Sequence, residues 1–308
     1  MTLLVDRAGF DPWSGRSGQA LADQDWEGEM SDLDYEAQYN NRARVPEYVD
    51  ISARWLLASR DYRSTKQGAQ LDIAYGPGER HRYDLFPAAA DPAPLLVYIH
   101  GGYWQRGDRT EYAFLARELN AAGITVALPS YSLCPAVSVM DIVAELRSFL
   151  AALWRRTRIY PLVIGHSAGG HLTAAMLASD WSSIAGVPAD LVRAGYAISG
   201  VFDLPPLVGT SLNDALRLSP EAACAASPLF WPAPPKARVF AAAVGGLESE
   251  EFLRQSRAIA RSWRQAGVTA EDVVVANTNH FTIVDELTRP TSPMFKSLAA
   301  LARTIAVR

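Results

Sequence analysis

Apolar residues follow two alternating patterns along most of this chain. Short runs without a polar position, such as residues 95–99, predict strands that are buried on both faces. Longer stretches in which apolar residues recur every three or four positions, such as 139–154, predict helices. In chain order, strands are predicted at 95–99, 124–128, 162–164, 192–198, 238–244 and 272–276, and helices at 112–122, 139–154, 168–179, 250–265 and 294–307. This alternation predicts an α/β fold in which helices cover both faces of a mostly parallel sheet.

Two further patterns precede this alternation. Residues 69–75 and 81–86 read as strands joined by a tight connection at 76–78, which predicts an antiparallel entry into the sheet. Apolar spacing in residues 33–60 predicts one or two amphipathic helices, interrupted at Pro46. These helices either pack on the body or form the roof of a pocket.

The domain organisation follows from the same patterns. Residues 1–32 are rich in Gly, Ser, Asp and Gln without a clear period, which predicts a loosely ordered N-terminal tail. Residues 33–308 are expected to form a single domain. Within it, the long interruption at 202–236 separates two strands and is expected to form a small cap.

The predicted strand at 162–164 runs into Gly165-His166-Ser167-Ala168-Gly169, directly before a predicted helix. A G-x-S-x-G sequence between a strand and a helix is the pattern of a nucleophile elbow, in which a serine sits on a strained turn. Three fixed positions match by chance in about one chain in ten of this length. Ser167 is therefore a candidate nucleophile whose assignment depends on the surrounding sequence.

A second motif follows the strand at 95–99, namely His100-Gly101-Gly102-Tyr103-Trp104. It resembles the HGG-type loop of α/β-hydrolases, whose backbone N–H groups form an oxyanion hole together with the N–H after the nucleophile. Gly102, Tyr103 and Ala168 are the expected donors, and Gly101 permits the turn. The two motifs occur in the order that this fold requires.

A catalytic triad also needs a carboxylate and then a histidine further along the chain. Glu248 lies in the turn after the strand at 238–244, and His280 follows the strand at 272–276. Asp203 also follows a strand and remains the alternative acid. His280 is the expected general base.

The remaining histidines are expected to have structural roles. His100 and His166 belong to the loops of the two motifs, where structural hydrogen bonds are expected. His171 lies four residues after Ser167 and is interpreted as a core histidine with its hydrogen bonds satisfied. His81 is interpreted as a surface or strand residue.

Composition excludes several classes of function. The net charge is −4 and charged residues make up 20% of the chain, so no basic surface for nucleic acid or an anionic membrane is expected. Cys134 and Cys224 are the two cysteines, far apart, which predicts neither a disulfide framework nor a zinc site. H-E-x-x-H and P-loop sequences are absent, so we expect no metal and no cofactor. The first residues do not resemble a signal peptide, and a cytoplasmic protein acting on a small-molecule substrate is expected. The oligomeric state is open, with a homodimer as one alternative.

HGGYW at 100–104 and GHSAGGHL at 165–172 resemble the arylformamidase (kynurenine formamidase) group of α/β-hydrolases, which is related to the hormone-sensitive-lipase-like esterases. The likeness runs from about residue 33 to the end and includes QYNNRARVP at 38–46, ESEEFLRQS at 248–256 and NHF at 279–281. It implies an α/β-hydrolase fold, with Ser167 as nucleophile, Glu248 in the acid position and His280 as base. The family has aspartate where this chain has Glu248.

The implied reaction is transfer of an acyl group to water, and the implied substrate is an aryl formamide such as N-formylkynurenine. Several aromatic residues near the catalytic loops or in the cap could form a slot for such a substrate, of which two or three are expected to line it: Tyr103, Trp104, Phe202, Phe230, Trp231 and Phe281. A carboxylesterase or amidase with the same triad is the main alternative. A non-catalytic small-molecule binder is a third, which retention of all three triad residues disfavours.

Overall fold

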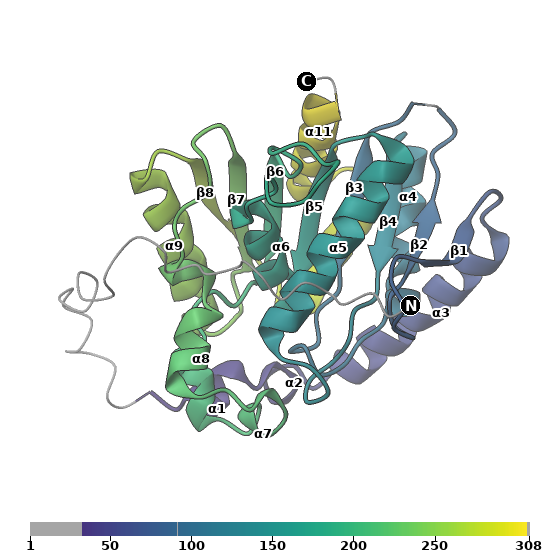
Figure 1. Ribbon diagram of the computed structural model, residues 1–308. Helices are drawn as coiled ribbons and strands as arrows, with labels where there is room; N and C mark the ends of the chain where they lie inside the picture. Colours follow the sequence, from purple (N-terminus) through teal and green to yellow (C-terminus); the bar gives the residue numbers. More distant parts are fainter. Residues whose placement is uncertain (1–32, 91, 307–308) are drawn as a thin grey trace. The chain divides into compact units, whose positions relative to one another are not determined.

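The computed structural model describes residues 33–90 and 92–306, and their centre is one β-sheet (Figure 1). The strand order is β1-β2-β4-β3-β5-β6-β7-β8. β1 pairs antiparallel with β2 and β2 with β4, whereas all later pairs are parallel. The strands are β1 (Gln70–Ala74), β2 (Arg82–Phe86), β3 (Leu95–Ile99), β4 (Thr125–Pro129), β5 (Pro161–His166), β6 (Ala194–Ile198), β7 (Val239–Gly245) and β8 (Thr269–Val275). The predicted antiparallel entry and mostly parallel sheet are both confirmed.

Helices cover both faces of this sheet (Figure 1). α5, α6 and α9 pack in the core on one face, and α3, α4 and α11 pack in the core on the other. The helices are α1 (Tyr35–Tyr39), α2 (Asn41–Arg44), α3 (Tyr48–Thr65), α4 (Ala116–Ala121), α5 (Val139–Thr157), α6 (Ala168–Ala178), α7 (Asn213–Leu216), α8 (Pro220–Ala225), α9 (Glu250–Gln265), α10 (Thr282–Asp285) and α11 (Pro293–Ala306). None of the helices in this part of the chain is long and apolar enough to cross a membrane.

The ends of the long helix α5 show how local sequence sets its bounds. The Ser138 hydroxyl accepts a hydrogen bond from the Asp141 N–H, and the Asp141 carboxylate accepts one from the Ser138 N–H. This capping box satisfies two N–H groups that the first turn would otherwise leave unpaired. Arg158 ends the helix in the left-handed region with φ 57°, so the chain turns directly into β5.

The predicted helix at 112–122 is shorter than expected. Two 3₁₀ turns, Arg109–Glu111 and Ala113–Leu115, precede α4. Ser59 of α3 accounts for this difference because its hydroxyl donates to the Glu111 carbonyl at 2.8 Å and accepts from the Phe114 N–H at 3.2 Å. The backbone groups of this segment therefore bind α3 instead of extending α4.

The predicted cap segment, 202–236, contains two 3₁₀ turns, Pro205–Gly209 and Pro228–Phe230, together with α7 and α8. It lies beside α1 and α2 at one end of the sheet (Figure 1). The Glu36 carboxylate of α1 accepts hydrogen bonds from the N–H and the hydroxyl of Ser211, both at 2.8 Å. The predicted tail, 1–32, lies outside the described residues.

Candidate active site

Ser167 occupies a sharp turn between β5 and α6. Its backbone has φ 58° and ψ −120°, a strained conformation for a residue with a side chain. Glycines are required around it: a Cβ atom at Gly165 would lie 2.2 Å from the Gly169 carbonyl oxygen, and one at Gly169 would lie 2.0 Å from the Ile99 carbonyl oxygen. The strand and helix therefore approach as closely as the G-x-S-x-G sequence predicts.

Glu248 and His280 form a buried pair. Oε2 of Glu248 lies 2.7 Å from Nδ1 of His280. Oε1 of the same carboxylate accepts hydrogen bonds from the Ser199 hydroxyl at 2.5 Å and the Gly245 N–H at 2.7 Å. Because the carboxylate is an acceptor, His280 donates from Nδ1 and keeps the lone pair of Nε2 available as a base.

Asp203, the alternative acid, belongs to a different cluster. Its carboxylate forms an ion pair with Arg254 at 2.7 Å, and Arg254 also pairs with Glu251 at 2.7 Å. Burial raises the pKa of Asp203, an effect that the Arg254 charge opposes. Among the described residues, the histidine is thus joined to Glu248 and not to Asp203.

The loop after β3 folds into a tight turn. Gly102 has φ 114°, Tyr103 φ 50° and Trp104 φ 56°. The Gly102 carbonyl accepts hydrogen bonds from the N–H groups of Gln105 and Arg106 at 3.0 and 3.1 Å. A Cβ at Gly102 would lie 2.2 Å from the Arg106 carbonyl oxygen, so only glycine fits this position.

This turn lies against the nucleophile elbow. A Cβ at Gly101 would be 3.0 Å from the Cβ of Ser167. In the described part of the chain, no hydrogen bond uses the backbone N–H of Gly102, Tyr103 or Ala168. These three amides, which the sequence predicted as oxyanion donors, therefore have no hydrogen-bond acceptor among the described residues.

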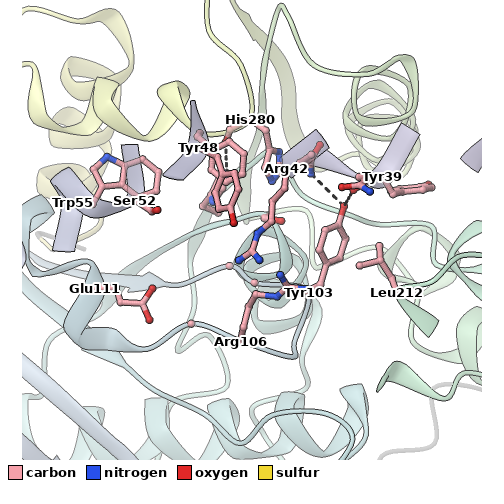
Figure 2. Close-up of a pocket in the computed structure, with 18 of the residues that line it drawn as sticks. Tyr39, Arg42, Tyr48, Ser52, Trp55, Tyr103, Arg106, Glu111, Leu212 and His280 are labelled. Carbon is pink, nitrogen blue, oxygen red and sulfur yellow. Dashed lines mark hydrogen bonds between the residues drawn. The ribbon is translucent and has the colours of Figure 1, made fainter. Parts of the chain in front are cut away.

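A cavity of about 530 Å³ opens over Ser167 and His280 (Figure 2). Segment 33–60 forms α1, α2 and the start of α3, three helices where one or two were predicted. It borders the pocket with Tyr39, Asn41, Arg42, Tyr48, Ser52 and Trp55. The Tyr103 hydroxyl donates to the Tyr39 carbonyl at 2.7 Å and accepts from the Asn41 side chain at 3.2 Å. Tyr103 therefore ties this segment to the loop after β3.

Of the aromatic residues predicted to form a slot, Tyr103 and Phe281 line the cavity. Trp104, Phe202 and Trp231 are instead buried outside its lining, and the half-buried Phe230 also lies outside it. Trp104 and Trp231 pack on the His171 ring, with centroids 5.0 and 6.3 Å apart, and Phe202 packs on Phe240 at 6.3 Å. These three side chains are therefore not in position to contact a substrate in the cavity. Their closeness in sequence to a catalytic loop does not set the direction in which the side chains point.

The structural hydrogen bonds predicted for His100 and His166 are confirmed, whereas His171 is satisfied only in part, because its buried Nδ1 has no hydrogen-bond partner among the described residues. His100 Nδ1 lies 2.8 Å from the Gly101 carbonyl, His166 Nε2 lies 2.7 Å from the His280 carbonyl, and His171 Nε2 lies 2.7 Å from the Ala226 carbonyl. Burial lowers the pKa of His100 and of His171 to about 4 each, and it lowers the pKa of His166 well below its usual value. These rings are therefore neutral at neutral pH.

The lowered pKa of His171 predicts acid sensitivity. Between pH 6.5 and about 4 the unfolded chain binds a proton at this histidine that the folded chain does not, so stability falls as the pH falls through this window. The expected cost is about 1.4 kcal/mol per pH unit for this residue. Urea unfolding of the wild type and of His171→Gln, at about pH 7 and pH 5.5, measures it. The variant should lose about 1 kcal/mol less than the wild type across this interval, whereas equal losses would contradict a buried neutral histidine.

Several residues of the site were not found from the sequence. Ser199, which supports Glu248, follows β6 and could have been found by the rule that informative residues follow parallel strands. Arg42, Arg106 and Glu111 line the cavity, and no spacing signal in the sequence marks them. The described residues contain no group of three or more His, Cys, Asp or Glu side chains able to bind a metal ion.

Comparisons with known proteins agree with this architecture. The sequence profile of the alpha/beta hydrolase family matches residues 96–306. The kynurenine formamidase of Danio rerio is 32% identical over 225 residues, covering 70% of this chain and 76% of the relative. The kynurenine formamidase of Drosophila melanogaster is 30% identical, covering 72% and 78%.

Solved structures show the same fold. A protein from Silicibacter sp. TM1040, provisionally named a thioesterase, superposes with a TM-score of 0.79 at 31% identity, covering 90% of this chain and 100% of that one. The carboxylesterase EstE1 from a metagenomic library superposes with a TM-score of 0.64 at 18% identity, covering 85% and 97%. The chain belongs to the alpha/beta hydrolase family and is an arylformamidase-like hydrolase within it.

Proposed function

We propose that this enzyme hydrolyses an aryl formamide such as N-formylkynurenine, with Ser167 as nucleophile, His280 as base and Glu248 as the acid of the triad. The hydrogen bond of 2.7 Å between Glu248 and His280, beside a cavity that both His280 and Ser167 line, is the observation that carries the proposal. The relatives named kynurenine formamidase support the choice of a formamide.

The reaction proceeds through an acyl-enzyme. Oγ of Ser167 attacks the formyl carbonyl carbon while its proton passes to Nε2 of His280. The carbonyl oxygen becomes an oxyanion, which the N–H groups of Gly102, Tyr103 and Ala168 stabilise. Collapse breaks the C–N bond, and the proton on His280 moves to the leaving nitrogen.

Water then completes the reaction. His280 takes a proton from water, the resulting hydroxide adds to the formyl ester, and Ser167 leaves as it regains that proton from His280. The formic acid released ionises to formate by losing its proton to water. Glu248 holds the imidazole in the required tautomer and stabilises its protonated form. The sequence of steps needs water and no cofactor.

A comparison of kcat/KM on N-formylkynurenine and on short p-nitrophenyl esters tests the substrate. We expect formate release from N-formylkynurenine with kcat/KM above about 10⁴ M⁻¹ s⁻¹, the lower end for an enzyme on its own substrate. Ester cleavage without formamide cleavage would contradict the proposal. That result would favour the alternative, a carboxylesterase or amidase with the same triad, which the superposition on a carboxylesterase also allows.

A further inference from the structure

Two arginine side chains project into the cavity from different segments. Arg42 comes from α2 and Arg106 from the loop after β3, and both line the cavity together with Ser167. Figure 2 shows the two side chains close together inside the cavity. Neither guanidinium forms a hydrogen bond or ion pair with any other described residue. The cavity therefore contains two cationic groups without an anionic partner in the described part of the chain.

Arg42 is held by stacking at the end of an aromatic wall. Its guanidinium carbon lies 4.7 Å from the centroid of the Tyr48 ring. The Tyr48 ring lies 5.6 Å from that of Phe281, which is 5.5 Å from the His280 ring. An aryl ring placed along this wall, with its formamide at Ser167, would extend its far substituents toward Arg42.

Arg106 makes the same region of the cavity more cationic. Burial lowers the pKa of Arg106, and the nearby Arg42 charge lowers it further. Two like charges in a partly buried space are unfavourable, and an anion between them relieves both the repulsion and the lost hydration. Arginine pairs suit a carboxylate because each guanidinium can donate two parallel hydrogen bonds.

Glu111 places an opposite charge in the same cavity. Its carboxylate lines the cavity and makes no ion pair with a described residue. Burial, and then the Asp108 charge, raise the pKa of Glu111, while the Arg80 charge, and after it the Arg42 charge, lower it. Arg42 thus acts on Glu111 through space without being paired to it, and this carboxylate is available for a cationic group.

We propose that Arg42 and Arg106 bind the carboxylate of the substrate and that Glu111 binds the adjacent ammonium, so the site selects aryl formamides that carry an α-amino acid group. This inference rests on the proposed function for the reacting end of the substrate. It assigns the recognition of the other end to three residues that take no part in bond breaking.

Three substrates test the binding of the carboxylate and of the ammonium separately. N-formylkynurenine has both, its desamino analogue has only the carboxylate, and N-formyl-2-aminoacetophenone has neither. Arg42→Gln and Arg106→Gln should each lower kcat/KM about 10- to 100-fold on the first two, mainly through KM, because a hydrogen bond to a charged group is lost. Glu111→Gln should lower it on N-formylkynurenine alone. Arg44→Gln, on the same helix α2 but outside the cavity lining, is the matched control and should have no effect.

Equal losses on all three substrates would overturn the proposal, since they would mean that the arginines support the fold or the reacting end. Unchanged kinetics on N-formylkynurenine would overturn it as well. If the enzyme cleaves esters but no formamide, the proposed function fails, and the subsite is still tested by two aryl acetates that differ in a carboxyalkyl arm on the ring. If the wild type has the higher kcat/KM on the acetate with the carboxyalkyl arm, and Arg42→Gln does not, the result would support the subsite. Equal kcat/KM of the wild type on the two acetates would contradict it.

Discussion

Replacement of Ser167 by alanine should lower kcat for N-formylkynurenine at least about 10⁴-fold, because the covalent step is lost while substrate binding and the oxyanion donors remain. The same variant should lose activity on p-nitrophenyl esters to a similar extent, since both reactions need the same nucleophile. Initial rates at saturating substrate measure the effect. KM should change little, because the Ser167 hydroxyl acts in the transition state rather than in binding.

Ser182→Ala is the matched control for this prediction. The Ser182 hydroxyl is exposed and bonded to Asp180 at 2.6 Å, away from the cavity lining. Activity should be unchanged in this variant, and circular dichroism should be the same for the wild type and both variants. Residual turnover of Ser167→Ala above about 1% of the wild type would be incompatible with a serine nucleophile.

The second large effect is expected at the acid. Glu248→Gln should lower kcat about 10³- to 10⁴-fold, because an amide at this position cannot stabilise protonated His280 and favours the wrong tautomer. Loss of the hydrogen bond from Nδ1 at 2.7 Å is the physical cause. The measurement is kcat at saturating substrate for the wild type and the variant.

Asp203→Asn is the comparison that decides between the two acids. Asp203 is paired with Arg254 at 2.7 Å, and the His280 Nδ1 hydrogen bond goes to Glu248 instead, so loss of Asp203 should change kcat less than about 10-fold and act mainly on stability. A small loss of kcat in Glu248→Gln together with a large loss in Asp203→Asn would show that Asp203 is the acid of the triad.

Much of the sheet could be predicted from the sequence because its strands are buried on both faces. The run at 95–99 coincides with β3, and the predicted helix at 250–265 coincides with α9. In both segments the local pattern of apolar residues is enough to predict the element, and the packing in the folded chain is consistent with that pattern. The edge strand β8 begins at Thr269, three residues before the predicted start, because its first residues include exposed polar positions that pair only with β7.

Other parts of the structure depend on contacts between residues distant in sequence. The break before α4 follows from Ser59, which lies 55 residues before Phe114. The direction of Trp104 follows from a turn with φ 56°, which the sequence HGGYW does not reveal. Local patterns therefore could not predict either feature.

The candidate site divides in the same way. Ser167, Glu248 and His280 could be located because each follows a strand whose carboxyl end faces the same edge of the sheet. The support of Glu248 by Ser199 and the convergence of Arg42 with Arg106 depend on loops that meet only in the folded chain. The residues proposed to recognise the substrate were accordingly harder to predict from the sequence than those of the proposed triad.

Titration of the enzyme with a fluorophosphonate that labels activated serines tests the central claim most directly. Hydrolysis of N-formylkynurenine is measured at each step, and peptide mass spectrometry locates the label. We expect activity to fall in proportion to labelling and to vanish when one equivalent is attached to Ser167. Hydrolysis that persists with Ser167 fully labelled, or a wild-type enzyme that releases no formate before labelling, would contradict the account.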